Sequence, residues 1–320
     1  MSNDHKGKQM ARFLVINGDD FGYSSAINAA VARNYAAGGL TSTSLLVNGA
    51  AAREAYRLAR TLPDLGVGWH VNLTEGGPVL PPRAVPSLVD RRGLFRPLGA
   101  QLRGILTGTT RTDELARELA AQLALLLDAG ITPTHVDGHL HAHAFPRVLP
   151  IVLDLMARHR IGALRSPRLG VWLTPGAMGQ VENPWTGLRP GSALARIVGA
   201  QGFAGNLRRL APRLDRPRAA DLARRGIVEA DQLYDAAHFL AADDPPAALA
   251  AALGARGGTI MEIMTHPAWN RDPARGAAEG ALLNDPRLHA ALLARGIRRV
   301  HYGMVRAEAA SMITRPPEGR

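Results

Sequence analysis

Cysteine is absent from this chain of 320 residues, which excludes disulfide bonds and thiolate metal ligands. Long apolar runs are absent too, since no stretch approaches the roughly eighteen uninterrupted apolar residues that a membrane-spanning helix needs. The N-terminal segment MSNDHKGKQMARF is polar and lacks the apolar core of a signal peptide. These absences predict a cytoplasmic protein in a reducing compartment.

Lysine is nearly absent, because Lys6 and Lys8 are the only two, and arginine supplies the rest of the positive charge behind a formal net charge of +11. No zinc-finger, RRM or helix-turn-helix pattern accompanies this charge, so it predicts no specific nucleic-acid partner. A basic surface still attracts anionic partners or lipid, which leaves peripheral association with the inner membrane surface open. The oligomeric state is open as well, a homodimer included.

The chain has a regular alternation of strand-like and helix-like segments. Short apolar runs predict strands at 12–17, 41–47, 66–71, 134–137, 161–165, 259–264 and 297–301. Helical patterns lie near 24–37, 49–61, 112–128, 146–159, 246–255 and 286–295. Such alternation indicates parallel strands joined by right-handed crossovers, and about seven units predict an α/β fold of the (β/α) barrel type, complete or incomplete.

Residues 170–235 break this alternation with a stretch rich in glycine, proline, arginine and scattered large apolar residues. Long insertions in barrel enzymes usually build the rim of the active site. We therefore expect one domain over residues 11–320, with an insertion or flap at its C-terminal mouth over 170–235. Residues 1–10 are expected to form a flexible N-terminus.

Unusual polar residues end or directly follow the predicted strands. Asp19 and Asp20 follow the first strand, where adjacent like charges need solvent, a cation or a proton between them. The others are Asn48, His70, Asn72, His139, His141, His143, Arg165 and His266. In a (β/α) barrel all these positions lie at one mouth, where barrel enzymes keep their active sites. Carboxylates and imidazoles that converge in a thiol-free chain suit a divalent cation.

The segment HVDGHLHAHAFP carries the densest set of potential ligands. His135, Asp137, His139, His141 and His143 recur at every second position, which in an extended segment places them on one side. Spacing alone does not say which of them bind a metal. Each motif also has an ordinary structural explanation, since Asn, Gly and Asp favour turns and a histidine can lie on the polar face of a strand. Joint placement at strand ends favours a functional site.

Five segments resemble the YdjC-like family of carbohydrate deacetylases. They are VINGDDFGYS, GGLTSTSLLVNG, GVGWHVNLTEGGP, PTHVDGHLHAHAFP and EIMTHPAW, and they follow the family's order between residues 15 and 269. The resemblance implies a (β/α) barrel, one divalent metal ion and hydrolysis of N-acetyl groups on amino sugars. The metal stays open between zinc, which suits Asp and His ligands, and magnesium, which prefers oxygen.

The resemblance also implies roles for individual residues. Carried over by motif, Asp20, His70 and His139 are metal ligands, Asp19 is the catalytic base, and His266 is a second catalytic group. Four further mouth residues are expected to bind the substrate: Asn48, Asn72, Arg165 and His141.

The insertion departs from the compact chitooligosaccharide deacetylases and is more similar to the hopanoid-biosynthesis-associated branch, HpnK. That similarity implies a lipid-linked N-acetylglucosaminyl hopanoid as substrate, and apolar residues among arginines suit an enzyme at a membrane surface. The alternatives are a soluble amino-sugar deacetylase of the chitooligosaccharide type and a non-catalytic metal- or sugar-binding protein. A two-metal phosphatase would favour more carboxylates than the mouth offers.

Overall fold

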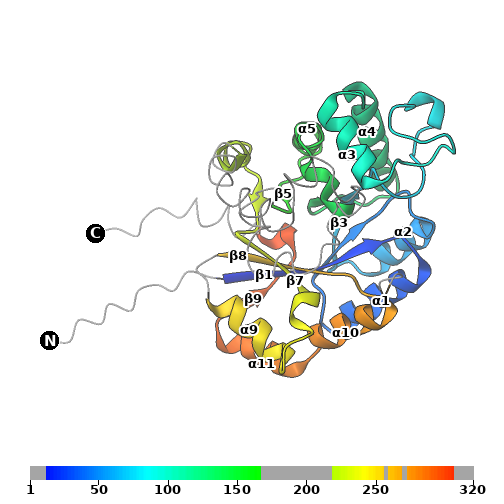
Figure 1. Cartoon of the computed structure of the whole chain (residues 1–320). Coiled ribbons are helices and arrows are strands. Elements are labelled where there is room, and N and C mark those ends of the chain that lie inside the picture. Colours follow the sequence, from blue (N-terminus) through cyan, green and yellow to red (C-terminus); the bar gives the residue numbers. More distant parts are fainter. Residues whose placement is uncertain (1–11, 167–217, 256–258, 269–271, 306–320) are drawn as a thin grey trace, which may run out of the picture.

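The computed structural model describes residues 12–166, 218–255, 259–268 and 272–305 (Figure 1). The strands are β1 (Arg12–Phe21), β2 (Ser42–Leu45), β3 (Gly66–Val71), β4 (Val136–Gly138), β5 (Ala163–Leu164), β6 (Val228–Glu229), β7 (Gln232–Asp235), β8 (Ile260–Thr265) and β9 (Ile297–Arg299). The helices are α1 (Ser25–Ala36), α2 (Ala52–Thr61), α3 (Leu98–Thr107), α4 (Thr112–Asp128), α5 (Leu149–His159), α9 (Pro245–Ala255), α10 (Pro273–Leu283) and α11 (Pro286–Ala294). Short 3-10 turns are η1 (Pro82–Ala84), η2 (His139–Ala144) and η3 (Ala236–Phe239). Within these residues, no helix has both the length and the hydrophobicity to cross a lipid bilayer.

The strands form one parallel sheet that curves round on itself. Their order is β6-β5-β4-β3-β2-β1-β8-β7, and β9 pairs with β1. β6 and β7 lie at opposite ends of this order, yet only residues 230 and 231 separate them, so they are at most about 11 Å apart along the chain. The chain itself therefore joins the two ends of the sheet, and the predicted (β/α) barrel, complete or incomplete, is confirmed. Figure 1 shows α9, α10, α11 and α1 below the strands and α4 and α5 above them.

Alternation along β1 separates the barrel interior from the core beneath the helices. Leu14 and Ile16 are fully buried in the main apolar core. A second apolar cluster consists of Phe13, Val15, Ala163, Val300, Tyr302 and Val305. Because successive strand side chains point to opposite faces, this second cluster fills the bottom of the barrel. Asn17 and Asp19 continue the same face toward the mouth, where the buried interior becomes polar.

The prediction that residues 170–235 form one insertion is wrong at its C-terminal end. β6 and β7 are barrel strands that pair with β5 and β8. They are only two and four residues long, too short to show a period of two in the sequence. The remainder of the predicted flap, with its apolar and basic side chains, falls mainly on residues 167–217, which lie outside the described residues.

Candidate active site

Asp19 and Asp20 lie near the end of β1, where this strand carries a β-bulge. Residues 18–21 of β1 pair with residues 43–45 of β2, so β1 contains one extra residue. Asp20 has a left-handed backbone with φ 65°. A bulge re-aims side chains that would otherwise alternate between the two faces of the sheet. It therefore explains how two consecutive carboxylates both reach the mouth, where Asp19 is 2% and Asp20 5% exposed.

The carboxylate of Asp20 lies between two imidazoles. Its Oδ1 is 3.2 Å from Nε2 of His70 in β3 and 2.8 Å from Nδ1 of His139 in η2. One possible ligand atom from each residue lies within 4.8 Å of the others. Burial raises the pKa of Asp20, but the charges and hydrogen bonds of the two imidazoles outweigh burial and hold it well below its usual range. The cluster combines an ionised carboxylate with two ring nitrogens, a donor set that suits zinc.

The ring of His70 is oriented by hydrogen bonds at Nδ1, the nitrogen that does not face Asp20. Its Nδ1 lies 2.8 Å from Oδ1 of Asp137 and 3.0 Å from Oγ of Ser44. A carboxylate that accepts Nδ1–H directs Nε2 toward a metal, as is common behind metal-binding histidines. Burial lowers the pKa of His70, but the nearby carboxylates more than compensate and raise it to about 10. A cation at this site would therefore compete with a proton for Nε2.

A second acidic cluster, behind the first, already contains a protein cation. Asp19, His70 and Asp137 also have possible ligand atoms within 4.8 Å of one another. The guanidinium of Arg165 pairs with both carboxylates: each terminal nitrogen is 2.7 Å from an oxygen of Asp19, and one is 3.1 Å from Asp137. Arg165 thus neutralises the position that a second metal would need. Of the two clusters found in the described chain, only the one around Asp20 is open to a cation.

Arg165 sets the charge state of Asp19. Burial raises the pKa of Asp19, but the charge and hydrogen bonds of Arg165 outweigh burial and lower it. The amide of Asn17 donates a further hydrogen bond of 2.8 Å to Oδ1 of Asp19. Asp19 is therefore ionised at neutral pH and able to accept a proton, although it is a weaker base than an unpaired carboxylate.

Arg165 is anchored deeper in the barrel by two residues that the sequence pattern did not reveal. Its Nε donates to Oε1 of Glu262 in β8 at 2.9 Å, and the hydroxyl of Tyr302 donates to Oε2 at 2.6 Å. All three side chains are fully buried. The expectation that Arg165 contacts the substrate is not met, because protein carboxylates enclose its guanidinium. The sequence does contain one indication of this pairing. Glu262 lies in the middle of the apolar run TIMEIMT, and a glutamate that is buried in such a strand requires a partner.

Asn48 and Asn72 organise the rim of the mouth. The Oδ1 of Asn72 accepts hydrogen bonds of 3.0 Å from the backbone N–H groups of Thr74 and Glu75. Its Nδ2 donates to Oδ1 of Asn48 and to the backbone oxygen of Glu75. Because Asn72 is fully buried and both ends of its amide are used within the protein, the expectation that it binds substrate is not met.

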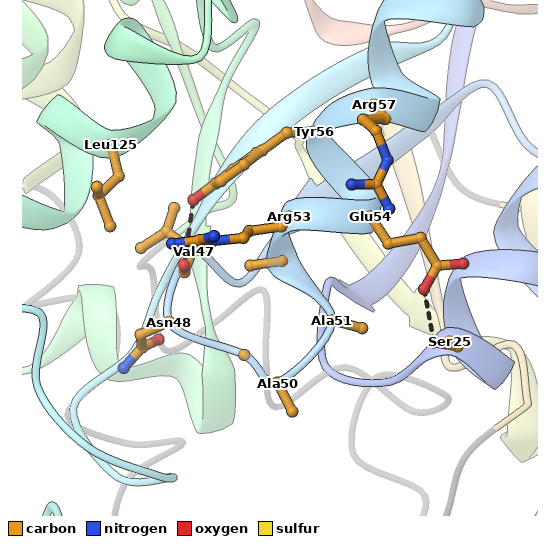
Figure 2. Close-up of a pocket in the computed structure, with 12 residues that line it drawn as sticks. Ser25, Val47, Asn48, Ala50, Ala51, Arg53, Glu54, Tyr56, Arg57 and Leu125 are labelled. Carbon is orange, nitrogen blue, oxygen red and sulfur yellow. Dashed lines mark hydrogen bonds between the residues drawn. The ribbon is translucent and has the colours of Figure 1, made fainter.

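Asn48 also lines a cavity of about 510 Å³ beside the loop after β2 (Figure 2). Arg53, Tyr56 and Arg57 of α2 and Leu125 of α4 contribute to its wall. None of the predicted metal ligands or catalytic residues lines this cavity. It is therefore distinct from the cluster around Asp20, and the role of Asn48 in substrate binding stays a prediction.

The extended conformation that would place all five residues of HVDGHLHAHAFP on one side ends at Gly138. β4 ends there, and the chain turns through η2, in which Leu140 and His141 have φ 49° and 57°. Two consecutive left-handed residues abolish the period of two on which the shared face depended. Residue spacing does not reveal such a turn, because neither residue is the glycine that usually marks a left-handed position.

The histidines of this segment consequently have different surroundings. His135 is fully buried, its ring centroid 4.7 Å from that of Tyr302, and burial lowers its pKa to about 4. The Nε2 of buried His143 lies 3.2 Å from the backbone oxygen of Arg165. Burial lowers the pKa of His141 to about 3, so this ring is neutral. His139 alone joins Asp20, and substrate binding by His141 stays a prediction.

His266 directly follows β8 and lies next to the end of β1. Gly18 of β1 pairs with Thr265, the last residue of β8, so Asp19 and His266 each directly follow a residue of this pair. Asp235, at the end of β7, is buried nearby; burial raises its pKa, and the charge of His266 partly offsets that rise. The sequence pattern did not reveal Asp235, because it falls within the region assigned to the insertion.

Comparison with known proteins identifies the family. A family model described as YdjC-like protein matches residues 13–294. A carbohydrate deacetylase of Geobacillus stearothermophilus is 42% identical over 152 residues, which cover 48% of this chain and 59% of that protein. A chitooligosaccharide deacetylase of Salmonella typhimurium is 43% identical over 160 residues, which cover 50% of this chain and 61% of that protein. The chain thus spans about three fifths of the length of these relatives.

A solved structure shares the fold over nearly the whole chain. It comes from Enterococcus faecalis V583 and is provisionally described as a cellobiose-phosphate cleavage protein. The alignment has a TM-score of 0.64 at 23% identity and covers 92% of this chain and 99% of that one, so it bears on the fold alone. Because the family model spans the barrel from β1 through α11, including every residue of the Asp20 cluster, this chain belongs to the YdjC-like family.

Proposed function

We propose that this protein is a metal-dependent hydrolase that removes the N-acetyl group from an N-acetylglucosamine-type sugar. The observation that carries this proposal is the cluster of buried Asp20 and His70 with partly buried His139, beside an ionised Asp19. The relatives named carbohydrate deacetylase and chitooligosaccharide deacetylase support the same class of reaction.

The donor set of the cluster fits one divalent cation. Asp20 would supply an oxygen, while His70 and His139 would each supply a ring nitrogen, which matches the three protein ligands and open position of catalytic zinc sites. Asp137 supports this assignment because it fixes the ring of His70. When bound, the cation would supply a Lewis acid for the acetamide carbonyl and acidify water. Zinc suits these ligands by type, while magnesium prefers more oxygen.

Asp19 is proposed as the general base. Its ionised carboxylate would take a proton from the attacking water as the carbon–oxygen bond to the acetamide carbonyl forms. Arg165 and Asn17 hold both of its oxygens in place, which limits the carboxylate to one orientation. This fixed orientation, beside the residue that would hold the cation, compensates for the reduced basicity of Asp19.

His266 is proposed as the acid that protonates the departing amine. A neutral imidazole cannot do this, so His266 would have to be charged in the reactive complex. Asp235, at the end of β7, is the buried carboxylate that interacts electrostatically with His266. Cleavage of the carbon–nitrogen bond then yields acetate and a free amino sugar.

A lipid-linked sugar of the hopanoid type is the finer substrate proposal, and it rests on large apolar residues among arginines in the sequence of residues 170–217. A soluble chitooligosaccharide is the alternative. Replacement of Trp172 and Trp185 by serine should impair hydrolysis of a lipid-linked substrate far more than that of a soluble one. Equal impairment would assign this segment a structural role and remove the support for a lipid.

Mass spectrometry of N-acetylated sugars incubated with the purified protein tests the function. We expect loss of one acetyl group with release of acetate, suppression of this reaction by EDTA, and recovery on addition of a divalent cation. Asp19→Asn provides the inactive control. If the wild-type protein binds these sugars but removes no acetyl group in the presence of cations, it is a binding protein and the hydrolase proposal is wrong.

A further inference from the structure

Leu140 combines two locally unfavourable features beside the candidate metal site. Its backbone is left-handed, with φ 49° and ψ 32°, a region that disfavours every residue except glycine and, to a lesser degree, Asn and Asp. Its side chain is 42% exposed, although a leucine gains stability by leaving water. Glycine or Asn at this position would relieve the backbone strain, and any polar residue would avoid the exposure of an apolar side chain. Neither local conformation nor core packing therefore explains a leucine at this position.

The left-handed backbone has a structural purpose that does not require leucine. It belongs to the turn after β4 that places Nδ1 of His139 2.8 Å from Asp20. The same turn buries His143, whose Nε2 lies 3.2 Å from the backbone oxygen of Arg165. Any residue that accepts a left-handed backbone would complete this turn, so the side chain of Leu140 needs a separate reason.

Leu140 lies beside the candidate metal site, which suggests a role for its side chain there. It directly follows a candidate metal ligand, because the Cα atoms of His139 and Leu140 are about 3.8 Å apart as sequence neighbours. It also lies at the C-terminal end of β4, and thus at the mouth of the barrel. By contrast, the exposed leucines Leu106 and Leu293 lie within helices α3 and α11.

We propose that Leu140 forms an apolar wall of the substrate site and contacts an apolar part of the bound sugar or of a group attached to it. This inference rests on the proposed deacetylase function. A sugar site is built mainly from polar groups that fix orientation, and an apolar surface completes it by covering the carbon–hydrogen face of the ligand. Because this contact exists before and during the reaction, it affects KM more than kcat.

Four variants test this contact. In Leu140→Gly and Leu140→Asn, the backbone strain is relieved, so Tm should equal or exceed that of the wild type, while KM for an N-acetylglucosamine dimer should rise roughly tenfold. Leu140→Met retains an apolar side chain and should keep KM near the wild-type value. Leu293→Ala, which removes an exposed leucine from a helix, is the matched control and should leave KM unchanged. Comparison of the dimer with its alkyl glycoside distinguishes contact with the sugar from contact with an attached group.

An unchanged KM in Leu140→Gly, with both substrates, would overturn the proposal. If Tm also fell, Leu140 would instead pack against the protein itself. Failure of the proposed function is distinguishable, because the wild-type protein would then release no acetate. In that case calorimetric binding of the same dimer decides the matter: a Kd weakened roughly tenfold by Leu140→Gly supports the contact, and an unchanged Kd contradicts it.

Discussion

The bottom and the mouth of the barrel interior differ in composition and in backbone geometry. At the bottom, Phe13 and Val15 of β1 pack in an apolar cluster on regular strands. At the mouth, the same strand carries a β-bulge and two buried carboxylates, Asp19 and Asp20. One continuous strand thus serves two purposes. The apolar end contributes stability by burial, which allows the polar end to hold buried charges in a less favourable geometry.

Strained backbone conformations are also more frequent at the mouth of the barrel than at its bottom. Asp20, Leu140, His141, Arg160 and Ala268 are the non-glycine residues with positive φ in the described ranges. Of these, all except Arg160 follow or end a strand at the mouth, whereas Arg160 ends helix α5. Left-handed non-glycine residues persist only where surrounding contacts determine them, and they tend to gather at functional sites. The mouth is therefore the part of the barrel that is arranged for chemistry.

The largest expected effect separates base from ligand at the mouth. Asp19→Asn should lower turnover by about 10² to 10⁴-fold, because the amide cannot accept the proton, while one metal ion per chain is retained. His70→Ala should lose the metal and the activity together. Metal content by atomic emission and acetate release are measured on the same samples. If both variants lose metal equally, Asp19 is itself a ligand.

The next effect concerns the buried charges beneath the mouth. Arg165→Met leaves Asp19, Asp137 and Glu262 buried without their shared cation, and should lower the free energy of unfolding by about 3–5 kcal/mol. Arg117→Met, which removes an exposed ion pair with Asp113, should change it little. Urea unfolding monitored by circular dichroism measures both. A small effect of Arg165→Met would mean that the three carboxylates are not ionised together.

How much of this site the sequence predicts depends on how local each feature is. The predicted ligands Asp20, His70 and His139 lie at or just after the ends of strands whose apolar patterns are visible, so topology alone brings them to one mouth. Glu262 and Arg165 are 97 positions apart, and their pairing depends on packing that no local pattern encodes. The left-handed residues at the bulge and in the turn, Asp20 and Leu140, are not glycines, so residue spacing could not reveal these two backbone features.

A smaller effect depends on pH and on a buried histidine below the mouth. The pKa of His135 falls from 6.5 in the unfolded chain to about 4 in the folded protein, so between these values only the unfolded chain binds the proton. The free energy of unfolding should therefore decrease as pH falls from 6.5 to 4, by about 3 kcal/mol from this residue. His135→Asn should reduce this dependence by the contribution of one histidine, since His141 also has a lowered pKa, whereas His159→Asn, at an exposed histidine, should leave the slope unchanged. Identical slopes in all three proteins would contradict the burial of a neutral His135.

The smallest expected effect comes from a substitution in the apolar cluster at the bottom of the barrel. Val15→Ala at the bottom of the barrel removes two buried methyl groups and should lower the free energy of unfolding by about 2 kcal/mol. Metal affinity and kcat of the folded variant should remain at wild-type values, because the mouth is unchanged. A variant that loses metal affinity in calorimetric titration would show that the two ends are coupled.

The most direct measurement is a crystal structure of the protein grown with Zn²⁺, with the ion located by its anomalous scattering. The site described above predicts one ion bonded to Asp20, His70 and His139 at about 2.0–2.2 Å, with Asp19 still paired to Arg165. An ion bonded to Asp19 or Asp137, or a second ion in place of the guanidinium, would contradict the division between metal ligands, base and buried cation.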